Sequence, residues 1–403
     1  MSCLYNANLV LRDRIVDRGW VQIENGLIKA IGQGAPPHEP QRIDAKGNYL
    51  APGFIDLHVH GAMGSDFLRA NPEEFLTAAN FHLSGGTTSL CATAATATYE
   101  EFELFLNVWE IAKRTAKGRL LPVHLEGPHL APSKAGAQDS KLMIAPETKQ
   151  RDWVLSRARK ISQMTIAPEL PGALPFIEAL TQAGVTMSAG HTEASDADMA
   201  AAVAAGLTKV THLFNAMSTA SKRGLFRQAG TLEFAMSDDT IFCELVADGF
   251  HVSPTLLKLA YRAKGPERIA LVSDSLAGNG LPEGTTFQLG SVRCKVGPGY
   301  SLLEDDSALA GSLARMIDLV RVMTQQGEVP LFDAVCMASF TPAKILGIDN
   351  QFGTLESGKA ADLVLFDESF VVRSVWVAGM PVFEFDNEDD DDGRGRLKRD
   401  EKG

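Results

Sequence analysis

The sequence predicts an α/β protein whose main part is a (β/α)8 TIM-type barrel, with a small β-sandwich formed by the N- and C-terminal segments. Eight short apolar runs, each ending in polar residues, alternate with segments typical of helices. This alternation is the pattern of parallel βαβ units. Strand-like runs with turn signals occupy both ends of the chain, and 403 residues with 45% apolar content are enough for a large core.

The two ends of the chain have the composition of short strands. NANLVL is followed by WVQIENGLIKAIG, whose central Asn-Gly is a hairpin signal, and DLVLFDESFVVRSVWVAGMPVFEF ends the chain's apolar part. We expect these segments to pair. The predicted regions are therefore 1–50 and 351–385 as the two parts of the sandwich, 51–350 as the barrel, and 386–403 as a disordered charged tail.

The barrel strands are expected in eight runs. They cover 54–61, 87–94, 120–127, 164–169, 184–191, 209–216, 241–251 and 268–275. Helices are expected between them, for example at 72–86 and 100–118. The second of these begins with acidic residues and ends with basic ones, as the helix dipole favours.

Composition excludes several classes of function. A formal charge of -12 and the lack of a basic stripe argue against nucleic-acid binding. We find no secretory signal pattern and no run of about 20 apolar residues, so we expect a cytoplasmic protein without a membrane partner. Five scattered cysteines, none arranged as CxxC, predict reduced thiols and no cysteine zinc site.

Polar residues at the ends of the predicted strands indicate a metal site. His58 and His60 alternate on one strand, so they share a face and lie roughly 6–7 Å apart, close enough to share an ion. Glu126, His191 and His212 follow later strands. Each residue alone has an ordinary structural explanation, such as a cap or a salt bridge. Barrel enzymes carry their chemistry at these strand ends, however, and the combination points to a metal.

The donor set suits metal-dependent hydrolysis. Glu126, His191 and His212 match the three protein ligands of a catalytic site with an open position for water. Asp274 in LVSDS is the candidate general base and acid, and His124 is assigned a supporting role in the barrel interior. The expected cofactor is one or two divalent ions per subunit, zinc first, with iron or manganese as alternatives.

Longer motifs around these residues identify a family. HLEGPHL, THLFNAM, VADGFHV, LVSDS and other stretches over nearly the whole chain resemble the amidohydrolase superfamily, and within it the N-acetylglucosamine-6-phosphate deacetylases. The resemblance implies that Glu126, His191 and His212 hold the primary metal, with His58 and His60 at a second position. It also implies hydrolysis of N-acetyl-D-glucosamine 6-phosphate to glucosamine 6-phosphate and acetate.

The resemblance also implies residues for binding the amino-sugar phosphate. These are His251, Asn215, Ala216 and an arginine, for which Arg227 in RQAG is our choice and Arg223 the alternative. A guanidinium forms forked hydrogen bonds with phosphate. The family's homodimer is implied as well, in which phosphate-binding residues can come from across the interface.

Two positions depart from the family. The first is RQAG at Arg227, where relatives usually read REPG, and the second is Gln138. Gln138 in KAGAQ stands where relatives commonly have a histidine close to the acyl group. Glutamine can donate a hydrogen bond but cannot carry charge. Two alternatives therefore stay open: a deacetylase for another N-acyl substrate, such as N-acetylgalactosamine 6-phosphate or an N-acyl amino acid, and a metal-binding barrel without catalysis.

Overall fold

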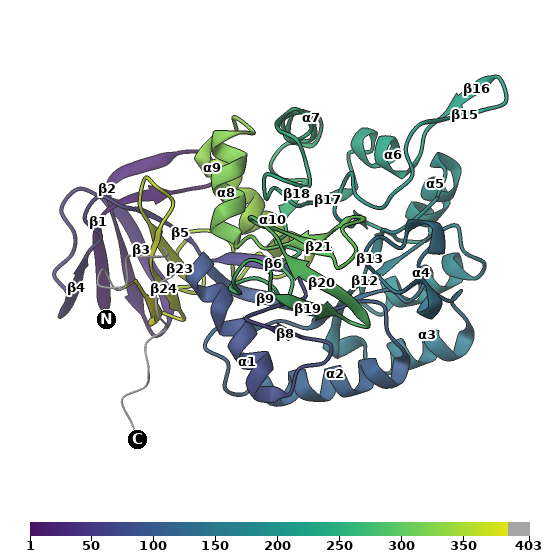
Figure 1. The fold of residues 1–403 in the computed structure, drawn as a ribbon. Helices are drawn as coiled ribbons and strands as arrows, with labels where there is room; N and C mark the ends of the chain where they lie inside the picture. The colour runs from purple at the N-terminus through teal and green to yellow at the C-terminus, as the bar shows by residue number, and fades with distance from the viewer. Residues whose placement is uncertain (386–403) are drawn as a thin grey trace.

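The computed structural model describes residues 1–385, so the predicted tail at 386–403 lies outside the described residues. A barrel with helices around it forms the main part, and a separate sheet joins both chain ends beside it (Figure 1). This architecture confirms the predicted fold class.

The terminal sheet is built from eight strands. They are β1 (Ser2–Val10), β2 (Ile15–Glu24), β3 (Leu27–Gln33), β4 (Gln41–Asp44), β5 (Tyr49–Pro52), β23 (Leu363–Phe366), β24 (Val372–Val377) and β25 (Met380–Glu384). Their order is β25-β24-β23-β5-β1-β2-β3, and β4 pairs with β1. The ends of the chain meet where β5 and β23 run antiparallel, with Leu50 opposite Leu365.

The predicted hairpin in this sheet is present. Asn25 and Gly26 connect β2 to β3 with φ of 53° and 78°, the two positive values that a type I′ turn requires.

The barrel contains eight parallel strands. They are β6 (Phe54–Val59), β9 (Thr87–Ala94), β11 (Val123–Glu126), β12 (Ile161–Ile166), β13 (Thr186–Ala189), β14 (Lys209–Val210), β17 (Phe242–Leu245) and β18 (Ile269–Leu271). Each pairs with the next in this order, and a parallel bridge between Val59 and Ser275 joins the first to the end of the last. Every predicted run overlaps one of these strands, and β12 begins three residues before its predicted run. Most strands stop earlier than predicted because the polar residues at their ends turn out of the sheet into the site.

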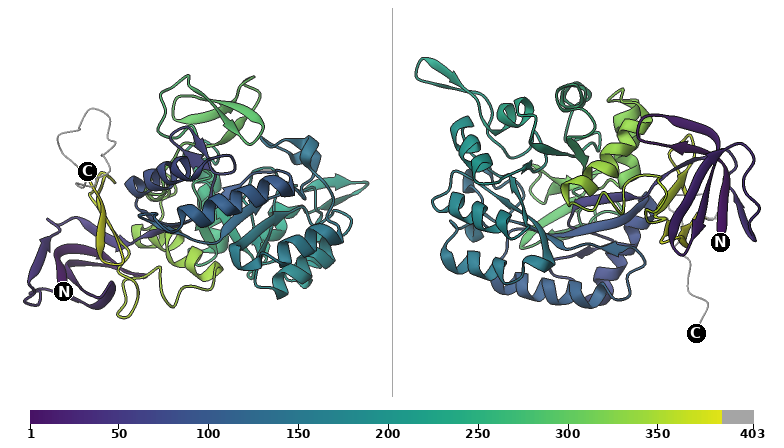
Figure 2. Two further views of the ribbon diagram at one scale, coloured as in Figure 1. Left: turned by 90° about the horizontal axis from the view of Figure 1, so that it is seen from below. Right: turned by 180° about the vertical axis from the view of Figure 1, so that it is seen from behind.

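The described part of the chain has ten α-helices. They lie around the barrel (Figures 1 and 2). They are α1 (Pro72–Phe81), α2 (Tyr99–Ala112), α3 (Thr148–Leu155), α4 (Ala173–Gln182), α5 (Asp196–Ala204), α6 (Thr231–Ser237), α7 (Pro254–Lys264), α8 (Met316–Gln325), α9 (Leu331–Ala338) and α10 (Phe340–Ile345). Capping boxes start α1 at Asn71 and α2 at Thr98. Both helices end a few residues before the predicted limits, and α1 passes into a 3-10 turn.

Two features were not predicted. An antiparallel sheet of β19 (Thr286–Leu289), β20 (Val292–Val296), β21 (Tyr300–Leu303) and β22 (Leu309–Ser312) lies between β18 and α8. It forms a layer beside the barrel, shown in green in the left view of Figure 2. A hairpin of β15 (Ser221–Arg223) and β16 (Phe226–Gln228) projects away from the barrel (Figure 1).

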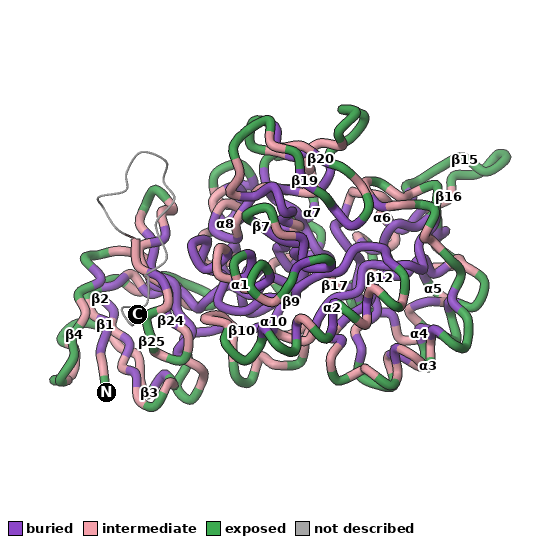
Figure 3. Tube along the Cα trace, turned by 60° about the horizontal axis from the view of Figure 1, so that its bottom comes forward, coloured by how far each residue is buried: buried purple, intermediate pink, exposed green. Residues whose placement is uncertain are grey.

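The buried residues concentrate in the barrel (Figure 3). Every residue of β6 and β9 is buried, whereas the β15–β16 hairpin is exposed along almost its whole length. Among the described residues, no helix combines the length and apolar character needed to cross a membrane.

Candidate active site

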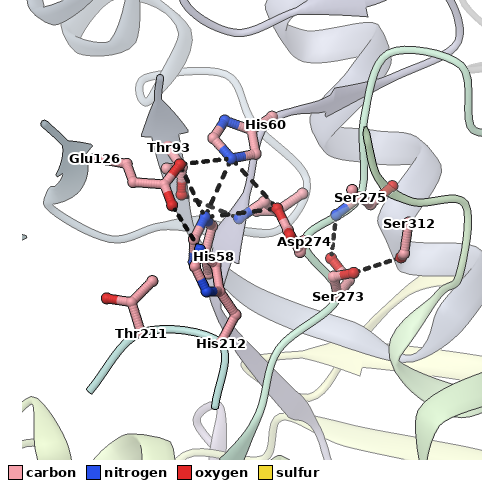
Figure 4. A network of polar contacts seen from close by, with 12 residues as sticks. His58, His60, Thr93, Glu126, Thr211, His212, Ser273, Asp274, Ser275 and Ser312 are labelled. Carbon is pink, nitrogen blue, oxygen red and sulfur yellow. Dashed lines mark hydrogen bonds and ion pairs between the residues drawn. The ribbon is translucent and has the colours of Figure 1, made fainter. Parts of the chain in front are cut away.

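The predicted site residues meet at the carboxyl ends of the barrel strands. His58 lies on β6 with His60 just after it, Glu126 ends β11, His191 follows β13 and His212 follows β14. All five are buried. Figure 4 shows Glu126 facing the histidines. Four separate segments of the sequence therefore bring five residues into one polar cluster.

Glu126 stands between two pairs of histidines. Its Oε1 lies 3.2 Å from His191 Nε2 and 3.1 Å from His212 Nε2. Its Oε2 lies 3.3 Å from His60 Nε2 and 3.5 Å from His58 Nε2. Within each pair the two Nε2 atoms are 3.1 Å apart. The cluster thus consists of two groups of three ligand atoms that share one carboxylate.

In three of the four histidine rings, Nδ1 lies within hydrogen-bond distance of an oxygen atom. His191 Nδ1 lies 2.7 Å from the carbonyl oxygen of Lys134, and His212 Nδ1 lies 3.2 Å from another backbone carbonyl. His58 Nδ1 lies 3.1 Å from a carboxylate oxygen of Glu244. Oxygen acceptors require hydrogen on Nδ1, which leaves an Nε2 lone pair facing the cluster. Facing lone pairs around a carboxylate repel one another without a cation, so these donors fit a divalent metal ion.

The electrostatics of the cluster agree with this assignment. Burial raises the pKa of Glu126, but neighbouring histidines lower it by more, so the pKa lies well below the usual range. Burial lowers the pKa of His60, but the carboxylates of Asp274 and Glu126 reverse the effect and raise it to about 9. The carboxylates therefore favour positive charge at this position, as a metal site does.

Asp274 lies beside the histidine pair of β6. Its Oδ1 is 3.3 Å from His60 Nε2 and 3.6 Å from His58 Nε2. Its backbone N–H donates to the carbonyl of His58 at 2.8 Å, which fixes the loop against β6. Burial raises the pKa of Asp274, but His58 and His60 lower it overall, so the carboxylate is ionised near neutral pH.

Three residues of the cluster have a left-handed backbone. The φ angles are 47° at His191, 29° at His212 and 47° at Asp274. Residues other than glycine rarely adopt these backbone angles, and the exceptions are concentrated at functional sites.

A pocket of about 200 Å³ opens onto the cluster, and Asn215, Ala216, His251 and Gln138 line it. Apolar walls come from Leu276 and from the unpredicted sheet, through Leu289 and Leu309. Four of the five residues predicted to bind substrate therefore lie at the polar cluster.

Two pocket residues are held firmly. Gln138 Oε1 accepts a hydrogen bond from the Thr96 N–H at 2.8 Å, which directs its amide nitrogen toward His191 at 3.3 Å. His251 Nδ1 lies 2.7 Å from the Asp248 carboxylate. Burial lowers the pKa of His251, but Asp248 raises it by more, so the imidazole tends to carry positive charge.

The candidate arginines lie elsewhere. Arg227 and its alternative Arg223 are exposed on the β15–β16 hairpin, and neither belongs to the pocket lining of its own chain. At the tip of the same hairpin, Leu225 is 88% exposed and Phe226 is 78% exposed.

Sequence reasoning missed two charged residues below the cluster. Lys209 on β14 and Glu244 on β17 are fully buried and form an ion pair, and Glu244 also contacts His58. The available signal was a charged residue inside each otherwise apolar strand, KVTH and FCELV.

Comparisons with known proteins show what the whole chain is similar to. Residues 49–382 match the amidohydrolase family. The chain is 31% identical to an N-acetylglucosamine-6-phosphate deacetylase of Lysinibacillus sphaericus over 371 residues, 91% of this chain and 93% of that protein.

Solved structures agree as well. The N-acetylglucosamine-6-phosphate deacetylase of Pasteurella multocida superimposes with a TM-score of 0.89 at 27% identity, covering 94% of this chain and 99% of that one. A mutant of the Mycobacterium smegmatis enzyme in complex with N-acetyl-D-glucosamine-6-phosphate gives 0.88 at 32% identity, covering 94% and 98%.

Proposed function

This chain belongs to the amidohydrolase family, and we propose that it hydrolyses N-acetyl-D-glucosamine 6-phosphate to glucosamine 6-phosphate and acetate. The observation that carries the proposal is the position of Glu126 between two histidine pairs, with Asp274 beside one of them. This arrangement suits amide hydrolysis, and the relatives that match over nearly the whole chain are deacetylases of this amino-sugar phosphate.

The ligands of the proposed metal follow from the two groups. Glu126, His191 and His212 would hold one ion, and Glu126 with His58 and His60 would hold a second. Zinc is our first choice, with iron and manganese as alternatives, since all three accept this mixture of nitrogen and oxygen donors. When bound, such an ion polarises the amide carbonyl and lowers the pKa of water.

The chain's own side chains would transfer the proton. As a C–O bond forms at the acyl carbon, Asp274 accepts a proton from the attacking water. It then delivers this proton to the amine nitrogen as the C–N bond breaks. Gln138 would donate a hydrogen bond to the acyl group through the amide nitrogen that Thr96 directs into the pocket.

The sugar phosphate would lie at the other side of the pocket. Asn215 and Ala216 follow His212 on one loop, and His251 offers an imidazole whose positive charge Asp248 supports. The lining contains no lysine or arginine among the described residues, so a phosphate needs another positive group.

We propose that this group comes from a second subunit of a homodimer. The projecting hairpin carries Arg227 together with exposed Leu225 and Phe226, and such an apolar tip favours burial against a partner. In a dimer joined through these hairpins, Arg227 of the partner subunit would complete the phosphate site. Arg223 is the alternative on the facing strand.

Acetate release from a panel of substrates tests the proposal. We expect the fastest turnover with N-acetylglucosamine 6-phosphate and much slower turnover with the unphosphorylated sugar. Faster turnover of N-acetylgalactosamine 6-phosphate or an N-acyl amino acid would favour the alternative substrate that Gln138 leaves open. A lack of acetate release from every substrate with added zinc, iron or manganese would reject catalysis.

A further inference from the structure

A second polar layer lies in the barrel interior below the histidines. Lys209 Nζ contacts both Glu244 Oε1 and Gln163 Oε1, and Gln163 in turn donates to the backbone carbonyl of Leu57 on β6. Lys209, Glu244 and Gln163 are all fully buried. This layer therefore connects β12, β14 and β17 to the strand that carries the first two histidines.

Glu244 links this layer to the metal cluster. While Oε1 contacts the lysine, Oε2 lies 3.1 Å from His58 Nδ1 and 3.4 Å from the backbone nitrogen of His212. One carboxylate therefore contacts a residue of each ligand group.

The contact with His58 differs from those of the other ligands. His191 and His212 direct Nδ1 to backbone carbonyls, which no substitution removes. His60 Nδ1 has no hydrogen-bond partner in the described part of the chain. For the group formed by His58, His60 and Glu126, the Nδ1 acceptor is therefore a side chain: Glu244 orients the ring of His58.

From this geometry we propose that Glu244, with its charge balanced by Lys209, is a positioning residue for metal binding. It accepts the hydrogen of His58 Nδ1 and so fixes the tautomer whose Nε2 can bind the ion of the His58–His60–Glu126 group. The inference rests on the metal centre proposed above. It adds that metal binding by the His58–His60–Glu126 group depends on Glu244, a residue that would not contact the ion.

Packing alone does not account for the pair. Replacing a buried ion pair by apolar residues of similar volume is often neutral or stabilising, so stability gives little reason for these charges. The carboxylate does have a use at His58, where it is the group that accepts from Nδ1, and a buried carboxylate needs a cation nearby. Lys209 supplies that cation without reaching the ligands.

Two variants separate positioning from folding. Glu244→Gln keeps the shape, but the amide cannot accept from His58 and from Lys209 at the same time. The double variant Lys209→Met with Glu244→Leu buries no charge and offers His58 no acceptor. Ser188→Ala is the matched control, because Ser188 lies in the same interior, hydrogen-bonded to Thr211 at 2.7 Å, without contacting a ligand side chain.

Zinc titration of the apoprotein, with thermal unfolding measured in parallel, gives the readout. We expect the original protein to bind two ions. In both Glu244 variants one ion should bind roughly 10–100-fold more weakly, as is typical when a histidine ligand loses its orienting partner, while the other is unaffected. The control should match the original protein.

Two outcomes would overturn the inference. The first is two ions bound by both variants with unchanged affinity, and the second is fewer than two ions bound by the original protein. If Glu244→Gln fails to fold because Lys209 is unpaired, the charge-free double variant still decides. Failure of the proposed function is distinguishable: a protein that binds two ions but releases no acetate would refute the deacetylase and leave this test intact.

Discussion

Asp274→Asn separates the proton transfer from metal binding. The amide has nearly the size of the carboxylate, and the hydrogen bonds of this loop to His58 and from Ser312 involve only backbone atoms of Asp274, so the fold should persist. What is lost is an ionised carboxylate 3.3 Å from His60 Nε2. The group formed by Glu126, His191 and His212 does not include Asp274 and should keep its ion.

The magnitude follows from the role of the carboxylate. Proton transfer by a positioned group contributes about 10²–10⁴-fold to the rate. At about 1.36 kcal/mol per tenfold change, this corresponds to roughly 2.7–5.4 kcal/mol of transition-state stabilisation. Because Asp274 would both take the proton and return it, we expect a loss of kcat near the upper end, with KM little changed.

The assay combines acetate release with metal analysis of the same sample. We expect Asp274→Asn to keep the ion of the Glu126–His191–His212 group and to show almost no turnover. If kcat stays within about tenfold of the original value while the metal is retained, proton transfer by Asp274 is refuted.

Three further changes test the pocket, the dimer and the core. Since burial lowers the pKa of His251 but Asp248 raises it overall from 6.5, the imidazolium persists to a higher pH than in a free histidine. KM for the phosphorylated sugar should therefore rise as pH rises through this pKa, and a dependence that survives in His251→Asn would contradict the assignment. Arg227→Ala should raise KM only for phosphorylated substrate; mixed dimers of this variant with His251→Ala should regain activity, and failure to do so would argue against an arginine acting across the interface. Phe102 is fully buried beside Tyr99, so Phe102→Ala should lower the free energy of unfolding in denaturant titrations by about 3–5 kcal/mol, whereas a loss below about 1 kcal/mol would show that the site repacks.

The barrel could be predicted from the sequence because its strands have a local signature. Each is a short apolar run bounded by polar residues, and helical segments separate the runs. The lengths of the individual strands were less predictable. The run at 209–216 forms only the two residues of β14, since His212 already has a left-handed backbone where the chain enters the site.

The polar cluster could also be predicted, because the carboxyl ends of parallel strands meet at one mouth of a barrel. His58, Glu126, His191 and His212 needed only their positions at or just after strand ends to be placed together. The shared carboxylate, with one oxygen toward each histidine pair, depends on side-chain directions that spacing does not give.

Other features depend on contacts between distant segments. The sheet of β19–β22 interrupts the repeat after β18, and although Gly290 in its first turn is a hairpin signal, the barrel pattern favours a helix there. The Lys209–Glu244 pair requires knowledge that β14 and β17 are neighbours. The proposed place of Arg227 at a phosphate rests on a proposed second subunit, which one sequence does not display.

Anomalous diffraction at the zinc absorption edge, from crystals of active zinc-loaded protein, would locate the ion itself. We expect a peak at coordination distance, roughly 2.0–2.2 Å, from Glu126 Oε1, His191 Nε2 and His212 Nε2. Active protein with no peak among these three atoms, or with its zinc bound elsewhere, would contradict this expectation.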